Sequence, residues 1–323
     1  MRPLKFHPIL KQTLWGGERI IPYKELASGL SRVGESRELS GMPGSESVVA
    51  EGPWTGSTLP ELIGRFGAEL LGKANYARFG QEFPLLVKFI DAREDLSIQV
   101  HPDDELARKR HGKSGKCEMW YVLEAEPGAS LLTGFSRPIA PAEYERRVAD
   151  NTLTDVLNRQ AIASGDVFYL PAGRVHSIGK GSFIVEIQQS SDITYRIYDF
   201  DRRDAAGNSR ELHTELAREA IDFESSENSR ITYAPENNQE VRLVTTPYFT
   251  TSLYTLTART RCDWSATDSF VAIVLLQGSG SLTDNEGNRI DVRQGETWLL
   301  PASTQWTEIT PHTAPLRLLT SRI

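Results

Sequence analysis

The sequence has few of the features that define several large classes of protein. It contains two cysteines, Cys117 and Cys262, in 323 residues. That is too few for a disulfide framework or a thiolate zinc finger, and it fits a reducing compartment. No apolar run is long enough to span a bilayer, and the N-terminal residues lack the apolar core of a signal peptide. A cytoplasmic protein without a membrane partner is therefore expected.

Positive charge is also in short supply. Lys and Arg total 36 against 43 Asp and Glu, which gives a formal net charge of −7. Binding to nucleic acid or to anionic membranes is therefore not expected. A small anionic substrate remains compatible with this balance, because a local group of Lys and Arg can bind it.

Short β-branched and aromatic runs, bounded by Gly, Pro, Asp or Ser, fill most of the chain. The clearest runs are residues 83–91, 96–100, 119–125, 166–171 and 182–189. Strands at this spacing with few helices between them predict a mainly β protein, built as a sandwich or a barrel.

Helical patterns are fewer. Residues 58–72 have Thr58 as a candidate N-cap and Pro60 near the first turn. Short helices are predicted at 141–150 and 152–159, and the basic run 108–116 is predicted to be a hydrated loop. Residues 210–223 predict an amphipathic helix, with an apolar face made of Leu212, Leu216, Ala220 and Ile221.

An internal repeat divides the chain into two parts. GDVFYLPAGRVH (165–176) and GETWLLPASTQW (295–306) share a Gly, an acidic residue and Leu-Pro-Ala at equal spacing. His176 in the first copy corresponds to Trp306 in the second. We therefore expect two similar β domains, residues 1–230 and 231–323, with a linker at 225–240. The second domain would lack metal ligands.

The segment LSIQVHPDD (96–104) places Gln99 and His101 on one face of a strand, roughly 7 Å apart. Pro102 ends the strand because it has no N–H to donate. Such a pair can belong to a solvated sheet face or to a metal site, and the pair alone favours the solvated face.

The frame formed by Gly165, Pro171, Gly173 and His176 resembles the second motif of the cupin superfamily. The first cupin motif has two histidines at strand spacing and then a glutamate. Here the corresponding residues are Gln99, His101 and Glu118. The resemblance implies two cupin-type jelly-roll β-barrel domains with a few short helices. It also implies a metal held by Gln99, His101, Glu118 and His176, and this shell suits Zn²⁺, with Mn, Fe or Co as alternatives.

Nearly the whole chain resembles the short bacterial form of the type I mannose-6-phosphate isomerases. The motifs that carry this resemblance include TLWGG (13–17), GESRELSG (34–41), LSIQVHPDDELA (96–107), GKCEMWYVL (115–123) and SSDITYRIYDFDR (190–202). It implies a zinc-dependent aldose–ketose isomerase with one Zn²⁺ per chain. Such an enzyme interconverts mannose 6-phosphate and fructose 6-phosphate through a cis-enediol. Arg37 departs from the family, which has Trp at this position.

The resemblance also assigns roles to charged residues. Arg196 matches the family's active-site arginine, Glu186 its proposed proton-transfer glutamate, and Lys116 the lysine two residues before the ligand glutamate. Arg202 and Asp192 are expected to bind the substrate, Arg202 through its phosphate. A purely structural ion pair between Arg196 and Asp192 is the competing interpretation.

Two other functions stay open: a related cupin isomerase or epimerase acting on another sugar phosphate, and a non-catalytic sugar-binding protein. Glu186, Arg196 and Lys116 weigh against the second, because a binding protein needs no base beside its metal.

Overall fold

The computed structural model describes residues 1–224 and 228–323, and these residues are mainly β-strands. Sheet I consists of β12 (Tyr195–Tyr198), β5 (Ile98–Val100), β10 (His176–Ile178), β7 (Ser130–Phe135) and β8 (Leu157–Ala161). Sheet II consists of β13 (Arg230–Ile231), β9 (Val167–Leu170), β6 (Glu118–Ala125), β11 (Ser182–Gln189), β4 (Leu85–Asp91), β3 (Val33–Leu39) and β2 (Ile9–Gln12).

Two further sheets come mostly from the last third of the chain. Sheet III consists of β1 (Leu4–Lys5), β20 (Thr297–Leu300), β17 (Val271–Gln277), β22 (Leu316–Arg322), β15 (Thr250–Leu256) and β14 (Val241–Thr245). Sheet IV consists of β16 (Thr260–Asp263), β21 (Trp306–Pro311), β18 (Ser279–Asp284) and β19 (Arg289–Arg293). Through β1, the N-terminus joins a sheet that is otherwise C-terminal.

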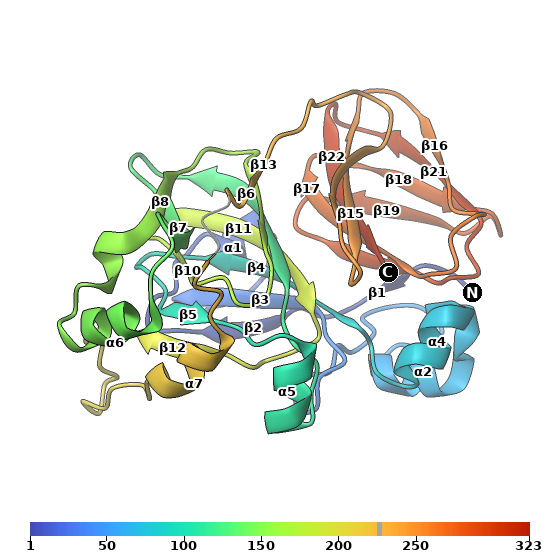
Figure 1. Ribbon diagram of the computed structural model, residues 1–323. Coiled ribbons are helices and arrows are strands. Elements are labelled where there is room, and N and C mark those ends of the chain that lie inside the picture. Colours follow the sequence, from blue (N-terminus) through green and yellow to red (C-terminus); the bar gives the residue numbers. More distant parts are fainter. Residues whose placement is uncertain (225–227) are drawn as a thin grey trace.

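The sheets stack in the order I, II, III, IV, with an apolar cluster in each space between them (Figure 1). Trp120 of sheet II and Ile178 of sheet I belong to the first cluster. Phe183 on the other face of sheet II belongs to the same cluster as Val274 of sheet III. Sheet II is therefore covered on both faces, and every residue of β4 and β11 is buried.

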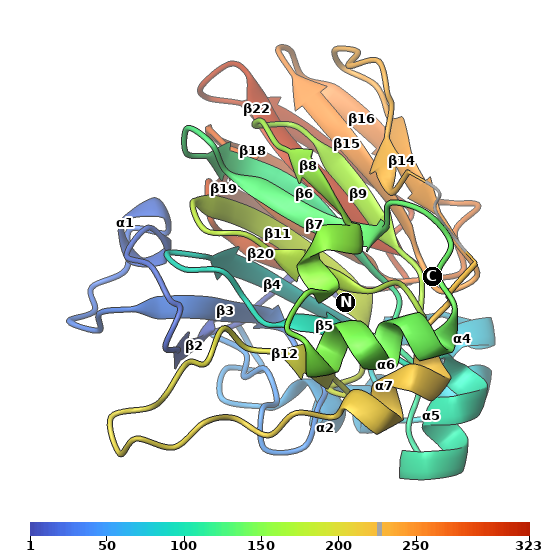
Figure 2. The same ribbon diagram turned by 60° about the vertical axis from the view of Figure 1, so that its left-hand side comes forward.

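The helices lie around this stack. They are α1 (Ile20–Tyr23), α2 (Leu59–Phe66), α3 (Ala68–Leu71), α4 (Lys73–Phe79), α5 (Asp104–His111), α6 (Pro141–Ala149), α7 (Thr214–Ala220) and the short 3₁₀ helix η1 (Leu153–Val156). Helices α6 and α7 cover the outer face of sheet I, where an apolar cluster joins them to its strands (Figure 2). Across the described residues, no helix combines the length and the apolar character that crossing a membrane requires.

Two helix predictions hold. Helix α2 begins after Thr58, whose side chain accepts a hydrogen bond from the Glu61 N–H while the Glu61 carboxylate accepts one from the Thr58 N–H. This is a capping box, which satisfies N–H groups that a helix leaves free at its start. Helix α6 occupies the predicted segment 141–150. The predicted helix 58–72 is divided at Gly67, where φ is +49°.

Three other predictions of local structure are wrong. Residues 152–159 form η1 and then strand β8, because this segment pairs with β7 at the edge of sheet I. Residues 108–111 of the predicted loop continue helix α5, which Asp103 caps at its N-terminus. The helix predicted at 210–223 covers only α7.

The start of the 210–223 segment is held by distant residues instead of by helical hydrogen bonds. Arg210 pairs with Asp199, and the backbone N–H of His213 donates to the carbonyl of Arg196, 2.6 Å away. Leu212 and Leu216, which belong to the predicted apolar face, are 47% and 38% exposed. The buried residue of the helix is Ala217.

The two copies of the repeat have the same local structure. Gly165 and Gly295 both have positive φ, at +90° and +80°, which an L side chain would adopt only with strain. Each is followed by a strand, a Pro and then a second strand that begins at His176 or Trp306. The division into two jelly-roll domains stays a prediction. Residues 225–227 of the predicted linker lie outside the described residues, and part of the remainder forms β13.

A buried ion pair lies where sheets II and III meet. The Lys24 ammonium donates to the Glu38 carboxylate at 2.8 Å and to the backbone carbonyl of Gly295, and both side chains are 4% exposed. The hydroxyl of Ser36 donates to the other Glu38 oxygen at 2.6 Å. This group of contacts fixes strand β3 against the C-terminal sheets.

Candidate metal centre and active site

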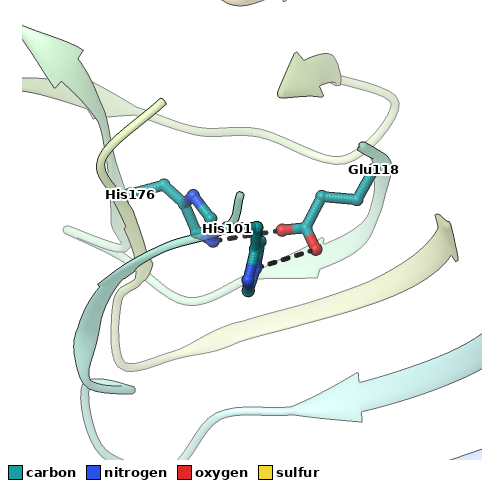
Figure 3. Close-up of side chains that lie close together, drawn as sticks. All are labelled: His101, Glu118 and His176. Atoms are coloured by element: carbon teal, nitrogen blue, oxygen red, sulfur yellow. Dashed lines mark ion pairs between the residues drawn. The ribbon is translucent and has the colours of Figure 1, made fainter. Parts of the chain in front are cut away.

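Three side chains from separate strands meet in the space between sheets I and II. His101 directly follows β5, Glu118 is the first residue of β6, and His176 is the first residue of β10. Glu118 Oε2 lies 3.5 Å from His101 Nε2, and its Oε1 lies 3.2 Å from His176 Nε2 (Figure 3). The candidate ligand atoms of the three residues lie within 4.8 Å of one another. We call these residues the His–Glu–His cluster.

The cluster contains polar atoms that lack hydrogen bonds. His101 Nε2 and both Glu118 oxygens are buried, and among the described residues none of them has a hydrogen-bond partner of acceptable geometry. Buried polar atoms are normally satisfied, so each exception needs an explanation. Two imidazole nitrogens and a carboxylate are ligands that Zn²⁺ prefers. The orphaned atoms therefore fit a divalent cation.

The second nitrogen of each imidazole is fixed by the backbone. His101 Nδ1 lies 2.8 Å from the carbonyl oxygen of Ile193, and His176 Nδ1 lies 2.8 Å from that of Arg174. A carbonyl can only accept, so each Nδ1 carries the proton and each Nε2 is left with a lone pair. This outer hydrogen bond is the arrangement that orients metal-binding histidines.

The charges around the cluster favour the protonation states that a cation requires. Burial, and then the positive charge of Lys116, lowers the pKa of His101 to about 3. Burial also lowers the pKa of His176. Burial alone would raise the pKa of Glu118, but the positive charge of Lys116 holds it well below its ordinary value. Neutral histidines and an ionised glutamate are the forms that bind metals.

Gln99 and Lys116 border the cluster. Gln99 Nε2 lies 3.2 Å from His176 Nε2, and turning the amide by 180° puts its oxygen in that position instead. Lys116 Nζ lies 2.9 Å from Glu118 Oε2, and its side chain is 6% exposed. Gln99, Lys116 and the cluster are thus brought together by the fold.

A row of charged residues crosses sheet II next to the cluster. Glu186 on β11 lies opposite Lys88 on β4, which lies opposite Arg37 on β3. Lys88 Nζ donates to Glu186 at 2.7 Å, and Trp120 Nε1 donates to the other Glu186 oxygen at 2.9 Å. Burial alone would lower the pKa of Lys88, but Glu186 and Glu35 raise it. The ammonium of Lys88 therefore stays charged beside the Glu186 carboxylate.

Sequence reasoning missed Lys88. Its signal is one lysine within the apolar run LLVKFID, which forms a strand buried on both faces. Arg37, the departure from the family pattern, donates to Glu35 at 2.5 Å and to the Ser45 hydroxyl at 3.1 Å. It therefore belongs to the same charged row.

The other predicted site residues, Arg196, Arg202 and Asp192, lie outside the His–Glu–His cluster and have partners of their own. Arg196 lies opposite Gln99 in the pairing of β12 with β5. Arg202 follows that strand and pairs with Asp199 at 3.3 Å. Asp192 pairs with Lys113 at the surface, 2.9 Å away, with about half of each side chain exposed. The structure therefore does not support the alternative ion pair between Asp192 and Arg196.

The fold and the site together define a class: a β-sheet protein with a buried His–Glu–His centre suited to a divalent cation. A family model of the phosphomannose isomerase type I catalytic domain matches residues 35–132. The chain is 34% identical over 303 residues to GmuF of Bacillus subtilis, named a probable mannose-6-phosphate isomerase, and 33% identical over 302 residues to a mannose-6-phosphate isomerase of Streptococcus mutans. These alignments cover 93% of this chain and 93% and 92% of the relatives.

Solved structures agree with this comparison. The mannose 6-phosphate isomerase from Bacillus subtilis matches with a TM-score of 0.90 and 29% identity, over 100% of both chains. A mutant of phosphomannose isomerase from Salmonella typhimurium has the same fold, with a TM-score of 0.79 and 16% identity over 99% of each chain. The chain belongs to the type I mannose-6-phosphate isomerase family.

Proposed function

We propose that this protein is a zinc-dependent aldose–ketose isomerase that interconverts mannose 6-phosphate and fructose 6-phosphate through a cis-enediol. The observation that carries the proposal is the buried Glu186 carboxylate, which lies in a charged row beside a His–Glu–His cluster with orphaned ligand atoms. A protein that only bound a sugar would have no use for a base in this position. The family of the chain supports the same reaction.

One Zn²⁺ per chain would be held by Gln99, His101, Glu118 and His176. Bound there, the cation supplies Lewis-acid stabilisation of the charge that develops on the sugar oxygens. Lys116, 2.9 Å from Glu118, keeps that ligand ionised.

Glu186 is the proposed base that moves the proton between C1 and C2 of the sugar. Its carboxylate is oriented by two donors, Lys88 Nζ and Trp120 Nε1, one to each oxygen. A base held in this way needs little reorganisation when the substrate arrives. Lys88 offsets the negative charge of Glu186 in a place where little water can reach it.

Arg196 supplies a fixed positive charge for the enediolate oxygens. Its place opposite Gln99 puts it on the proposed ligand side of β12. Arg202 is proposed to bind the substrate phosphate. A substrate-binding role for Asp192 stays a prediction, because its carboxylate is paired with Lys113.

The test is a coupled assay on the purified protein. Mannose 6-phosphate is supplied, and the fructose 6-phosphate that forms is converted to a detectable product. We expect turnover that a chelator abolishes and that added zinc restores. Turnover that survives complete metal removal would exclude the proposed mechanism. Turnover of a different sugar phosphate alone would favour another isomerase or an epimerase, and binding without turnover would favour a sugar-binding protein.

A further inference from the structure

Three arginines gather around one buried aspartate beyond the end of β12. Arg210 binds Asp199 through two parallel hydrogen bonds, from Nε at 2.7 Å and from Nη2 at 2.5 Å. Arg202 Nη1 donates to the same carboxylate at 3.3 Å. Arg196 lies three residues before Asp199, on the strand itself. We call Asp199, Arg202 and Arg210 the Asp199 cluster.

The backbone holds this cluster rigidly. Phe200 and Asp201 both have positive φ, +55° and +52°, so the chain turns sharply directly after Asp199. Arg202 then donates from its backbone N–H to the Asp199 carbonyl at 3.1 Å, and from Nη2 to the Asp95 carbonyl at 2.5 Å. Left-handed backbone at two successive residues other than glycine is strained, and such strain is commonly found at functional sites.

One residue of the cluster lines a cavity. Arg210 lines a cavity of about 500 Å³ together with Trp15 and Arg32. Trp15 belongs to the apolar cluster that separates sheets I and II, which also contains Trp120. Burial and, second, the charge of Arg210 lower the pKa of Arg196, so the two guanidinium groups are close to each other.

Positive charge exceeds buried negative charge in this region. Arg196, Arg202 and Arg210 carry three positive charges against the one buried carboxylate of Asp199. Three further carboxylates are near. Glu94 lies 3.6 Å from Arg202 with its side chain 53% exposed, and the Glu211 side chain is 83% exposed. The half-buried Asp95 carboxylate accepts a hydrogen bond from the Lys180 N–H at 2.7 Å. The Nε atom of Arg196 is buried and has no hydrogen-bond partner among the described residues. A phosphate group could accept hydrogen bonds from the guanidinium nitrogens that remain free of partners.

We propose that Arg210 contacts the substrate phosphate together with Arg202, and that Asp199 is the positioning residue that aims both guanidinium groups. The inference rests on the proposed function, because the phosphate is that of the sugar phosphate. Asp199 occupies two of the five N–H donors of Arg210 and leaves three for a ligand. Guanidinium groups fixed in this way bind phosphate oxygens through charged hydrogen bonds.

The first experiment separates binding of the substrate from turnover. Arg210→Gln should raise the KM for mannose 6-phosphate about 10- to 100-fold, since it removes a hydrogen bond to a charged group, and should change kcat by less than about threefold. Asp199→Asn should raise KM in the same direction. The matched control is Arg203→Gln in the same loop, whose guanidinium binds only the Gly207 carbonyl among the described residues and whose loss should leave KM unchanged. An unchanged KM in Arg210→Gln overturns the proposal.

A second experiment excludes a merely structural role for Arg210. If Arg210 served only to neutralise buried Asp199, the double variant Asp199→Asn/Arg210→Gln would recover the wild-type KM. We expect the double variant to keep the high KM while its melting temperature approaches that of wild type. Recovery of KM would overturn the proposal.

Binding of inorganic phosphate, measured by calorimetry, tests the contact without any turnover. Wild type should bind phosphate at least about tenfold more tightly than Arg210→Gln, with equal metal content. If wild type shows this difference but does not isomerise mannose 6-phosphate, the proposed function fails and the phosphate contact stands. Equal phosphate affinity in both proteins overturns the phosphate contact, whatever the assay shows.

Discussion

Glu186, the proposed base, is buried and is contacted by Lys88 and Trp120. Glu186→Gln keeps the shape and the hydrogen-bonding capacity of the side chain but removes its basicity. We expect kcat to fall by about 10²-fold or more, which is the usual contribution of a positioned base. Metal content per chain, measured by plasma mass spectrometry, should stay at the wild-type value.

Glu145→Gln provides the control for this prediction, because it makes the same chemical change on an exposed side chain that pairs with Arg218. It should leave kcat unaltered. Near-normal turnover in Glu186→Gln would mean that another residue acts as the base.

The histidines of the cluster predict a pH dependence of the metal-free protein. The pKa of His101 is about 3 when folded, against an ordinary value of 6.5. Between these values the unfolded chain binds a proton that the folded chain does not. The free energy of unfolding therefore falls as the pH falls, by up to about 1.4 kcal/mol per pH unit for each such group. His176, with its lowered pKa, acts in the same direction.

We therefore expect the melting temperature of chelator-treated protein to drop between about pH 7 and about pH 5, where carboxylates with ordinary or lowered pKa values stay ionised. In His101→Gln the drop should be smaller, because one of the two groups is gone. Equal slopes for the two proteins would contradict the low pKa of His101.

Single residues of the site differ in how far the sequence reveals them. Gln99, His101, Glu118 and His176, which the fold brings together, could be singled out because they stand in recurring motifs at strand ends. Lys88 and Asp199 were not predicted from the sequence, because only their contacts in the folded chain set them apart from other charged residues. Lys88 meets Glu186 from 98 positions away along the chain, and a pairing of that kind leaves no local pattern.

At the scale of single elements, helix α2 offers a test of stability that leaves the site untouched. Thr58→Ala removes the side-chain oxygen that accepts the Glu61 N–H. Loss of an N-cap of this type typically costs about 1 kcal/mol. We expect a lower melting temperature with unaltered kcat and KM, and Ser57→Ala, one residue earlier, should have little effect. A Thr58→Ala protein as stable as wild type would show that the capping box contributes nothing.

Elements whose sequence pattern agrees with their packing were predicted well. Strand β11 has the predicted bounds, 182–189, because β-branched and aromatic residues fill a strand that is covered on both faces. The segment 210–223 was predicted poorly for the opposite reason. Its apolar spacing favours a helix, but Arg210 and His213 are bound to β12 and its following loop, so the helix starts late. Tertiary contacts here outweigh local preference.

At the scale of the whole molecule, the buried pair of Lys24 and Glu38 links sheet II to the C-terminal sheets. Lys24→Met leaves the Glu38 carboxylate buried without its cation, which typically costs about 3 kcal/mol or more. We expect a clear drop in melting temperature, and partial recovery in Lys24→Met/Glu38→Gln, where no charge remains. Arg218→Met removes an exposed pair with Glu145 and should cost less than about 1 kcal/mol. Equal losses in the two single variants would contradict this account.

Sheet II has polar chemistry on one face and an apolar cluster shared with sheet III on the other. The second copy of the repeat has Trp306 where the first has His176, and the strands around it supply the apolar side of this contact. Without residues 241–323, the apolar face of the strands that bear Glu186 and Lys88 would be exposed to water. The C-terminal sheets thus keep water away from the face of sheet II opposite the His–Glu–His cluster.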